Sequence, residues 1–592
     1  MNLNEIYTVI IYSITLIVTL TFIVRILYMF KNNIEHKMNI SSPTENTISQ
    51  VNPDQGQILL SHQKFSESTH VPQNYFLGSS PSTSLLGKLY HFFWGEQKSD
   101  VSLDMEKNII FTSRRINFPQ FCYTINLFIV CNFMRFDTIK MIYKILFLMD
   151  IPQKESLFIG GFVPMTKCEY AIEIKKPLEN GFVIIQTPSA KIIIDRKNND
   201  EYYVESFFRI TSKKFESKRM IVPTKDGKIS VRIFFDGITK TNTISSNSQN
   251  PIITPFCSLS SSQLKYPSFT HGYIKISTIV LPDQDPSTVL LYSISQSAPR
   301  KLITPIGEKN MQPFGFDGPH DYTTIKNGLI YMKKFGYRGT IWFDIEYLKD
   351  ENYIKFLKSL IHDESFEAGI HFSKSLTRLS PSEACNLISD EYTNISIQLN
   401  TPPKTWCSFR NGDNVDFANY IFDKYQMIWR NGEAGINAEP VVGNLDDDTW
   451  DWWNLASKAG IIYPVFAHQT DREPATKYSI SFSKFRTWVD NYHAKGISII
   501  PFQEWWLINA NTFDTIITNI SVQKQTLTFK VKTNGEKGLV NVNIASDHVL
   551  TITDTNTEEK IMWSNHGDNS ITFYVQSNHE YEIFMNEIDV SR

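Results

Sequence analysis

Residues 314–346 read FGFDGPHDYTTIKNGLIYMKKFGYRGTIWFDIE, and this stretch decides the expected fold. The apolar run at 313–316 predicts a strand, and Asp317-Gly318-Pro319 predicts a turn directly after it. Ligands of parallel α/β folds gather where strands end, at their carboxyl ends. Asp317 is therefore the first candidate for a functional residue.

The remainder of this stretch predicts a helix followed by a second strand. Thr323 or Thr324 is expected to cap the helix, whose apolar residues recur near a period of 3.6. Gly336 is expected to end the helix, and GTIWF at 339–343 is typical of a short strand. Strand, loop, helix and strand in this order predict a parallel α/β domain.

Composition narrows the classes of protein. With 592 residues the chain is long enough for several domains, and 58 Lys and Arg against 61 Asp and Glu provide no basic excess for nucleic acid. The six cysteines form no C-x-x-C pair, which argues against a zinc ribbon and leaves disulfides open. The 13% aromatic content fits core packing or sugar-stacking surfaces.

The N-terminal part predicts a membrane attachment. Residues 6–30 are long and apolar enough for a transmembrane anchor, with no cleavage signal. Residues 31–85 have the composition of a disordered linker, and 86–155 are an uncertain, mainly helical segment. Basic residues after residue 24 favour a cytoplasmic main domain. We nevertheless expect a single-pass cell-membrane protein with its large domain outside, because long domains translocate regardless of charge.

Two regions show the alternation of β-domains. Short β-branched and aromatic runs separated by Gly, Pro, Asn and Asp predict an all-β domain at 156–300 and a C-terminal β-sandwich at 511–592. The α/β domain lies between them, at 301–510. The tryptophans at 450, 452 and 453 could line a sugar subsite, and at least two of them are expected to pack the domain instead.

Within the stretch at 314–346, FDGPH at 316–320 and GTIWF at 339–343 resemble motifs of the polysaccharide deacetylases, the NodB-homology domain of carbohydrate esterase family four. The resemblance covers about 313–506. It implies a distorted (β/α) barrel that removes acetyl groups from N-acetyl sugars with a bound divalent metal. In the family's first motif one aspartate is the general base and the next binds metal. Here Phe316 takes the base position and Asp317 the metal position.

The family's second motif supplies two metal-binding histidines. EAGIHFSKSLTRLSPSEA matches it with His371, whereas Ser375 stands where the second histidine is expected. His320, beside the Gly-Pro pair, is an additional candidate ligand. The resemblance therefore implies Asp317 and His371 as ligands of a divalent metal, and we add His320, which is not a usual ligand in the family, as a third candidate. An aspartate with imidazoles suits zinc first, with cobalt or iron as alternatives.

Three further residues match the family's remaining motifs. Arg410 takes the place of the arginine that orients the base, and Asp448 opens a D-x-x-D-W match. His468 ends an apolar strand where the family's histidine protonates the leaving group. The predicted catalytic residues are His468, Arg410 and Asp448. A substitute base is left open among Asp321, Glu433, Glu439 and Asp471.

We therefore expect a membrane-anchored, metal-dependent hydrolase that deacetylates N-acetyl sugars of surface glycans. The alternative is a catalytically inactive relative that binds glycan or acts as a scaffold, since the usual base and second histidine are missing. A glycoside hydrolase using Glu346 and Glu504 is a third reading. The expected partners are a glycan and a membrane, without nucleic acid, and no sequence feature fixes the oligomeric state.

Overall fold

The computed structural model describes strands within residues 57–116 and most of residues 156–586, with gaps that include 257–263, 280–286, 431–442 and 472–478. The predicted anchor at 6–30 lies outside the described residues. Among the helices that are described, none has the length and apolar character needed to cross a membrane.

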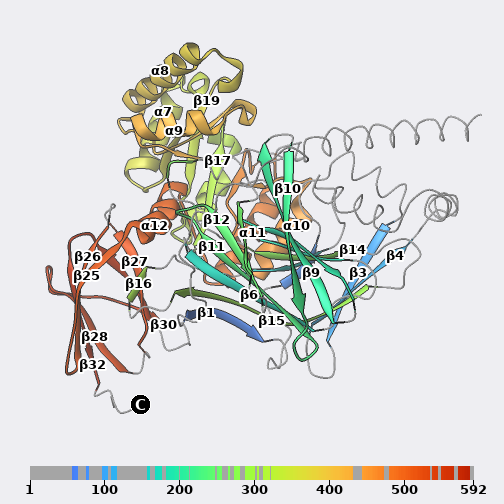
Figure 1. Cartoon of the computed structure of the whole chain (residues 1–592). Coiled ribbons are helices and arrows are strands. Elements are labelled where there is room, and N and C mark those ends of the chain that lie inside the picture. Colours follow the sequence, from blue (N-terminus) through green and yellow to red (C-terminus); the bar gives the residue numbers. More distant parts are fainter. Residues whose placement is uncertain are drawn as a thin grey trace, which may run out of the picture. The chain divides into compact units, whose positions relative to one another are not determined.

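A curled parallel sheet forms the α/β domain (Figure 1). Its strands are β17 (Met311–Asp317), β18 (Thr340–Phe343), β19 (Glu367–Phe372), β20 (Thr405–Ser408), β21 (Ile428–Trp429), β22 (Gly443–Asn444), β23 (Val465–Ala467) and β24 (Ser498–Ile500). Strand β17 is central, because it pairs in parallel with three strands, β18, β23 and β24. The predicted strand–helix alternation and barrel-like curl are present.

Helices follow most of these strands and bury an apolar face. They are α6 (Lys326–Lys333), α7 (Glu351–His362), α8 (Pro381–Leu399), α9 (Val415–Tyr425), α10 (Trp450–Ala459), α11 (Phe482–Ala494) and α12 (Phe502–Asp514). Helix α8 begins with a capping box in which Ser380 and Glu383 satisfy each other's backbone N–H groups, and Pro381 occupies the first turn. Each described residue of β17, β18 and β20 is buried, so both faces of the sheet are covered.

The start of α6 differs from the prediction. Thr323 and Thr324 lie in a short 3-10 turn ahead of the helix, and the N-cap residue is Ile325, which makes no side-chain cap hydrogen bond. Instead, the carboxylate of Asp471 accepts hydrogen bonds from Asn327 N at 2.5 Å and Gly328 N at 3.2 Å. Local sequence cannot reveal a cap that lies more than 140 residues away. Gly336 has a φ of +70°, which agrees with its predicted role as the helix end.

Two antiparallel sheets precede the α/β domain. One contains β1 (Gln57–Lys64), β3 (Glu96–Leu103), β4 (Ile109–Ile116), β6 (Lys167–Lys175), β11 (Lys228–Asp236), β12 (Thr241–Ser245), β13 (Ile252–Pro255) and β15 (Ser287–Pro299). The other contains β2 (Tyr75–Gly78), β5 (Ser156–Ile159), β7 (Phe182–Gln186), β8 (Lys191–Arg196), β9 (Glu201–Thr211), β10 (Lys214–Pro223) and β14 (Ile274–Ile279). Inward-facing Ile and Val side chains of both sheets form one hydrophobic core.

Four of these strands fall where the sequence predicted none. Strands β1 and β2 lie inside the expected linker at 31–85, and β3 and β4 lie inside the expected helical segment at 86–155. Strand β1 is ordered by antiparallel pairing along β15, from Gln57 opposite Pro299 to Lys64 opposite Ser293. Pairing with a distant strand therefore overrides the polar local composition.

The C-terminal region also contains two antiparallel sheets. One consists of β16 (Ile303–Pro305), β27 (Lys537–Val542), β30 (Ser564–Asn565) and β31 (Ile571–Gln576), and the other of β25 (Ile516–Gln523), β26 (Thr526–Lys532), β28 (Val549–Asp554), β29 (Glu559–Lys560) and β32 (Glu580–Met585). Strand β16 lies within 301–510, the range predicted for the barrel.

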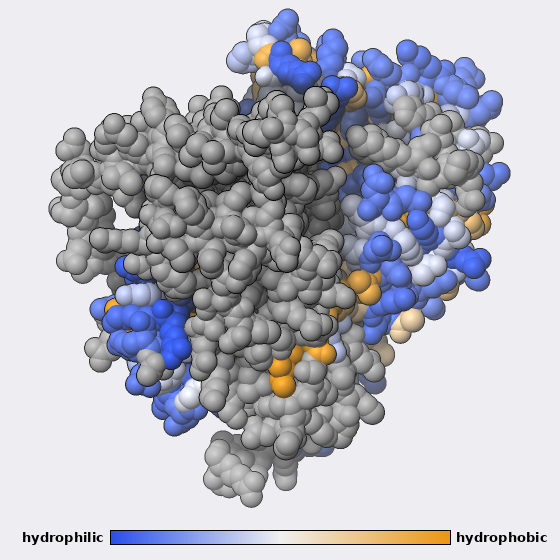
Figure 2. Space-filling model, turned by 90° about the vertical axis from the view of Figure 1, so that its right-hand side faces the viewer, coloured by the Kyte–Doolittle hydropathy of each residue, from blue (hydrophilic) through white to orange (hydrophobic). Residues whose placement is uncertain are grey.

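On the face shown in Figure 2, the described residues are mostly hydrophilic and the apolar ones form small groups.

The tryptophans of α10 pack the structure. Trp452 is 5% exposed, and its ring contacts Phe158 of β5 edge-on at 6.0 Å. Trp453 is fully buried, and its indole N–H donates to the carbonyl of Asn444 at 2.8 Å. Two of the three tryptophans thus serve packing, as expected.

Candidate functional site

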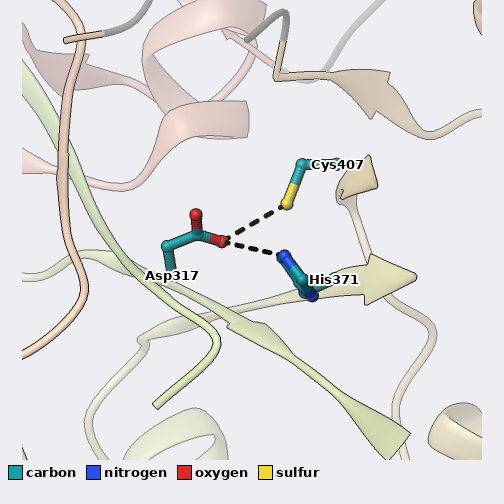
Figure 3. Close-up of side chains that lie close together, drawn as sticks. All are labelled: Asp317, His371 and Cys407. Carbon is teal, nitrogen blue, oxygen red and sulfur yellow. Dashed lines mark hydrogen bonds and ion pairs between the residues drawn. The ribbon is translucent and has the colours of Figure 1, made fainter. Parts of the chain in front are cut away.

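Asp317, the last residue of β17, lies at the centre of a buried polar cluster (Figure 3). It is 4% exposed. Its Oδ1 lies 3.9 Å from His371 Nε2 and accepts a hydrogen bond from Cys407 Sγ at 3.5 Å. The three ligand-type atoms all lie within 4.8 Å of one another, which makes this group a possible metal site.

The parallel register brings His371 and Cys407 together. The two residues are Cα partners on β19 and β20, so their side chains leave the sheet on the same side. Asp317 ends β17, two strands away in the same sheet. Sequence reasoning missed Cys407, and the available signal was a cysteine near the end of the strand that follows the His371 strand.

Arg430, directly after β21, forms a buried ion pair with Asp317. Its Nη1 lies 3.0 Å from Asp317 Oδ2, and its side chain is 1% exposed. The guanidinium carbon lies over the rings of Trp342 and Phe466, at 4.7 and 4.3 Å from their centroids. Sequence reasoning assigned this type of role to Arg410, although a charged residue after the apolar strand of Trp429 was a usable signal.

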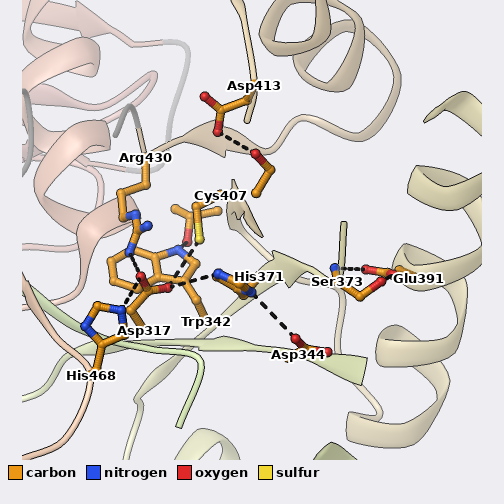
Figure 4. Close-up of polar contacts among 12 residues, drawn as sticks. Asp317, Trp342, Asp344, His371, Ser373, Glu391, Cys407, Asp413, Arg430 and His468 are labelled. Atoms are coloured by element: carbon orange, nitrogen blue, oxygen red, sulfur yellow. Dashed lines mark hydrogen bonds and ion pairs between the residues drawn. The ribbon is translucent and has the colours of Figure 1, made fainter. Parts of the chain in front are cut away.

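His468 and His371 lie on opposite sides of the Asp317 carboxylate (Figure 4). His468 Nε2 is 3.5 Å from Asp317 Oδ2, and 36% of the His468 side chain is exposed. His371 faces Asp317 through Nε2, and its second ring nitrogen, Nδ1, lies 3.7 Å from Asp344 Oδ2. Asp344 is thus placed to orient His371 with Nε2 toward Asp317.

Charge and burial act together on the ionisable groups of the cluster. Burial alone would raise the pKa of Asp317, but Arg430 and the two histidines more than offset it and hold the pKa well below its usual range. Burial lowers the pKa of His468, so its imidazole is neutral at neutral pH. Burial also raises the pKa of the Cys407 thiol well above its usual value. In the case of His371, Asp317 and Asp344 outweigh burial and raise the pKa.

Two residues predicted to be catalytic do not join this cluster. Arg410 is exposed and its guanidinium stacks on Phe409, with 5.2 Å from Cζ to the ring centroid. Asp448 is also exposed, whereas its neighbour Asp446 is buried and accepts hydrogen bonds from the backbone and hydroxyl of Thr449. The structure therefore brings together Asp317, His371 and His468 of the predicted set, and leaves Arg410 and Asp448 outside.

The predicted substitutes for the missing groups have other roles or are not described. His320, Asp321, Glu433 and Glu439 lie outside the described residues. Asp471 caps helix α6. Phe316 is fully buried and packs against Phe314 and Phe485, so no proton acceptor occupies its position. Ser375 Oγ contacts the carbonyl of Gly412 at 3.4 Å.

The carboxylates required by the glycoside hydrolase reading are not paired. Glu504 forms an ion pair with Arg338 at 2.8 Å, and Arg338 lies before the start of β18. Glu346 lies after the end of β18, in the 3-10 turn Ile345–Tyr347. Glu504 of α12 thus lies near the start of β18 and Glu346 follows its end, which does not suit a glycosidase pair.

The donor set can be tested against the geometry that metals require. Zinc bonds of about 2.0–2.3 Å in a tetrahedron place neighbouring ligand atoms about 3.3–3.6 Å apart. The observed 3.5 Å from Asp317 Oδ1 to Cys407 Sγ meets this value, and the 3.9 Å to His371 Nε2 exceeds it slightly. One oxygen, one nitrogen and one sulfur form a reasonable zinc or cobalt set that leaves a fourth position open. The residues therefore fit such a metal in donor type, and their three ligand atoms lie within 4.8 Å of one another.

Comparisons with known proteins agree with the resemblance in part. No family model matches the chain, and no curated protein does. Each of the following structures covers 33% of this chain. They are peptidoglycan deacetylase PdaC from Bacillus subtilis (16% identity, 90% of that chain, TM-score 0.25), a family 4 acetyl xylan esterase from Clostridium thermocellum with a cobalt ion (15%, 90%, 0.25), and BA3943, a CE4 family pseudoenzyme from Bacillus anthracis (17%, 65%, 0.25).

This likeness spans a third of the chain, the same share as the sequence resemblance. The activities and the bound cobalt belong to those proteins. Because the TM-scores and identities are low, the chemistry of this chain is inferred from its own side chains.

Proposed function

We propose that this protein is a metal-dependent hydrolase with a divergent deacetylase-like site, and that it removes acetyl groups from N-acetyl sugars of a glycan. The observation that carries the proposal is the buried cluster of Asp317, His371 and Cys407 at the carboxyl ends of parallel strands. Zinc or cobalt is the metal of choice for these three donors. Residues 6–30 would anchor the protein to the cell membrane, with a surface glycan as its substrate.

Cys407 supplies the donor that is lost at Ser375. Cys407 lies on β20, beside His371 on β19, and not in the segment that directly follows His371. The motif around His371 therefore does not contain the replacing donor. Arg430 binds the Oδ2 atom of Asp317 and leaves Oδ1 facing His371 and Cys407. The Arg430 guanidinium thus fixes the orientation of the Asp317 carboxylate. It also places a positive charge near the proposed metal position.

A metal held by these residues would polarise the acetyl carbonyl and lower the pKa of a coordinated water. His468 is the described group that can move the proton, because it is neutral at neutral pH, lies beside Asp317 and has a partly exposed side chain. We assign both proton steps to His468: its Nε2 accepts the water proton and then donates it to the leaving nitrogen. The water oxygen would add to the acetyl carbon, the C–N bond of the acetamide would break, and acetate and a free amine would form.

The role of His468 predicts a separation of binding from chemistry. We expect His468→Gln to lower kcat by about 10²–10⁴-fold, the usual contribution of a general acid–base group, while the metal content stays unchanged. Acetate release and metal content measured on the same preparations would check this. Loss of the metal in His468→Gln would show instead that the histidine is a ligand.

The test of the metal site is the metal content of the full chain beside two cysteine variants. We expect about one zinc or cobalt per chain in the parent, and Cys407→Ala to weaken binding by at least about tenfold. Cys385→Ala is the matched control, because Cys385 is a half-buried cysteine on α8 outside the cluster. Cobalt loading adds a second readout, a sulfur-to-cobalt charge-transfer band that Cys407→Ala should abolish.

Two outcomes of that experiment would contradict the proposal. A folded parent that binds no zinc or cobalt would favour the second candidate function, an inactive glycan-binding relative. The specific observation behind this candidate is that Arg430 already neutralises Asp317 while Phe316 fills the base position. Equal metal binding by Cys407→Ala and the parent would remove Cys407 from the ligand set.

A further inference from the structure

The loop that follows β20 carries an exposed aromatic ring beside the proposed site. Phe409 is 41% exposed, although large apolar side chains are usually buried. Its ring lies edge-on to the ring of His371, with centroids 6.3 Å apart and an interplanar angle of 87°. The exposed ring therefore borders the cluster at the side of the candidate metal ligand His371.

Arg410 extends this surface with a positive charge. Its guanidinium lies over the Phe409 ring at 5.2 Å, and within the described part of the chain no carboxylate lies within ion-pair distance of it. Its backbone has φ 56° and ψ 28°, a left-handed conformation that is unfavourable for arginine. Such strain persists only where the surrounding structure enforces it, and it is common at ligand-binding positions.

The neighbouring contacts show what enforces this conformation. Ser408 Oγ donates to Asp413 Oδ2 at 3.0 Å, and Thr377 N donates to Gly412 O at 2.9 Å. A Cβ atom on Gly412 would come within 1.7 Å of Ser375 Oγ, so the two loops pack closely. These contacts hold the loop that carries Phe409 and Arg410 in one conformation. Less conformational entropy is therefore lost when a ligand binds to the two side chains.

We propose that Phe409 and Arg410 form a subsite for an acidic sugar residue of the glycan, next to the residue that loses its acetyl group. A sugar ring would stack on Phe409, and Arg410 would pair with the carboxylate of that sugar. This subsite rests on the proposed function and narrows its substrate class to N-acetylated glycans that carry carboxylates. Arg410 thereby contacts substrate instead of orienting a base.

The experiment compares two oligosaccharides of equal length on the full chain. The neutral probe is an oligomer of N-acetylglucosamine, and the acidic probe is a hyaluronan oligomer, in which N-acetylglucosamine alternates with glucuronic acid. Dissociation constants are measured by calorimetry on metal-loaded and chelator-treated protein, and acetate release is measured separately. The variants are Arg410→Gln, Phe409→Ala and Arg378→Gln, the last being an exposed arginine on the neighbouring loop that serves as the charge-matched control.

We expect the parent to bind the acidic oligomer about fivefold more tightly than the neutral one, and Arg410→Gln to abolish this ratio. Phe409→Ala should weaken both oligomers by about fivefold, because stacking does not depend on charge. Arg378→Gln should keep the ratio. Equal affinities in the parent, no binding of either oligomer, or an equal loss of the ratio in Arg378→Gln would overturn the subsite.

The same measurements contradict the subsite and the hydrolase activity separately. Charge-selective binding without acetate release would support the subsite and overturn the hydrolase. Acetate release without a charge preference would overturn the subsite alone.

Discussion

Asp317→Ala is expected to lower the free energy of unfolding of the α/β domain by about 3–5 kcal/mol, apart from any effect on metal binding. The reason is Arg430, whose guanidinium is 1% exposed and lies 3.0 Å from Asp317. Removing the carboxylate leaves this cation buried and without its anionic partner. An isolated buried charge is far more costly than a buried pair.

Denaturant unfolding, followed by the fluorescence of buried tryptophans such as Trp342, provides the measurement. Arg430→Met should also destabilise the domain, because it leaves Asp317 unpaired in a buried site. The double variant Asp317→Ala/Arg430→Met should recover most of the loss, since apolar replacement of a buried pair is often neutral. If the double variant is as unstable as the sum of the single variants, the ion pair is not the cause.

This prediction also bears on the metal test. A loss of metal in Asp317→Ala has two physical causes, the loss of a ligand and the destabilisation by Arg430. The double variant separates them, because it restores the fold without restoring the ligand. Cys407→Ala avoids the problem, as it removes a neutral thiol.

Glu367→Gln is expected to abolish a loss of stability that the parent shows between about pH 4.5 and pH 7. Glu367 begins β19, and its carboxylate accepts hydrogen bonds from Thr340 Oγ1, Thr405 Oγ1 and Gln503 N at 3.0, 2.8 and 2.7 Å. Burial raises the pKa of this carboxyl from 4.5 to about 7, and the three hydrogen bonds oppose the shift only in part.

The sign follows from the two pKa values. The folded state binds the proton more tightly than the unfolded state, so the stabilisation is complete below about pH 4.5 and is lost as pH rises through about 7. The shift corresponds to about 3 kcal/mol. Glutamine keeps the contacts without titrating, because its carbonyl can accept from Gln503 N while its amide donates to the threonine hydroxyls.

Unfolding free energies of parent and variant at pH 5 and pH 8 test this expectation. The variant should gain about 2.5 kcal/mol relative to the parent between these two pH values, because the stabilisation is not yet complete at pH 5. Glu391 of α8 also has its pKa raised to about 7, chiefly by burial, and retains its own pH dependence in both proteins. Parallel stability curves for parent and variant would contradict the assignment to Glu367.

Much of the site could be predicted because the informative residues end strands. Asp317, His371 and His468 each follow an apolar run, and parallel strands bring their carboxyl ends to the same edge of the sheet. Cys407 and Arg430 were missed for a different reason. Both also stand at strand ends, which was a usable signal, but their contacts with Asp317 depend on which strands are neighbours and in which register, and the sequence does not provide that order.

In the N-terminal region, the sequence predicted disorder where the structure has strands. Averaged over 31–85, the composition is polar enough to predict a disordered linker, yet the short runs QILLSHQK and YFLG form strands β1 and β2. Their partners β15 and β5 lie far along the chain. The average composition of a segment does not include the stabilisation that a short run gains by pairing with a distant strand.

The origin of the cluster from separate strands has a consequence for the rate at which the protein folds and unfolds. Asp317 and Cys407 are 90 residues apart, and two further strands must pair between them before they meet. Contacts that close such long loops form slowly, after the local strand–helix units. We therefore expect the Asp317–Arg430 pair and any bound ion to be absent from the folding transition state. Interactions of this kind slow unfolding and leave the folding rate almost unchanged, so they lengthen the lifetime of the native state.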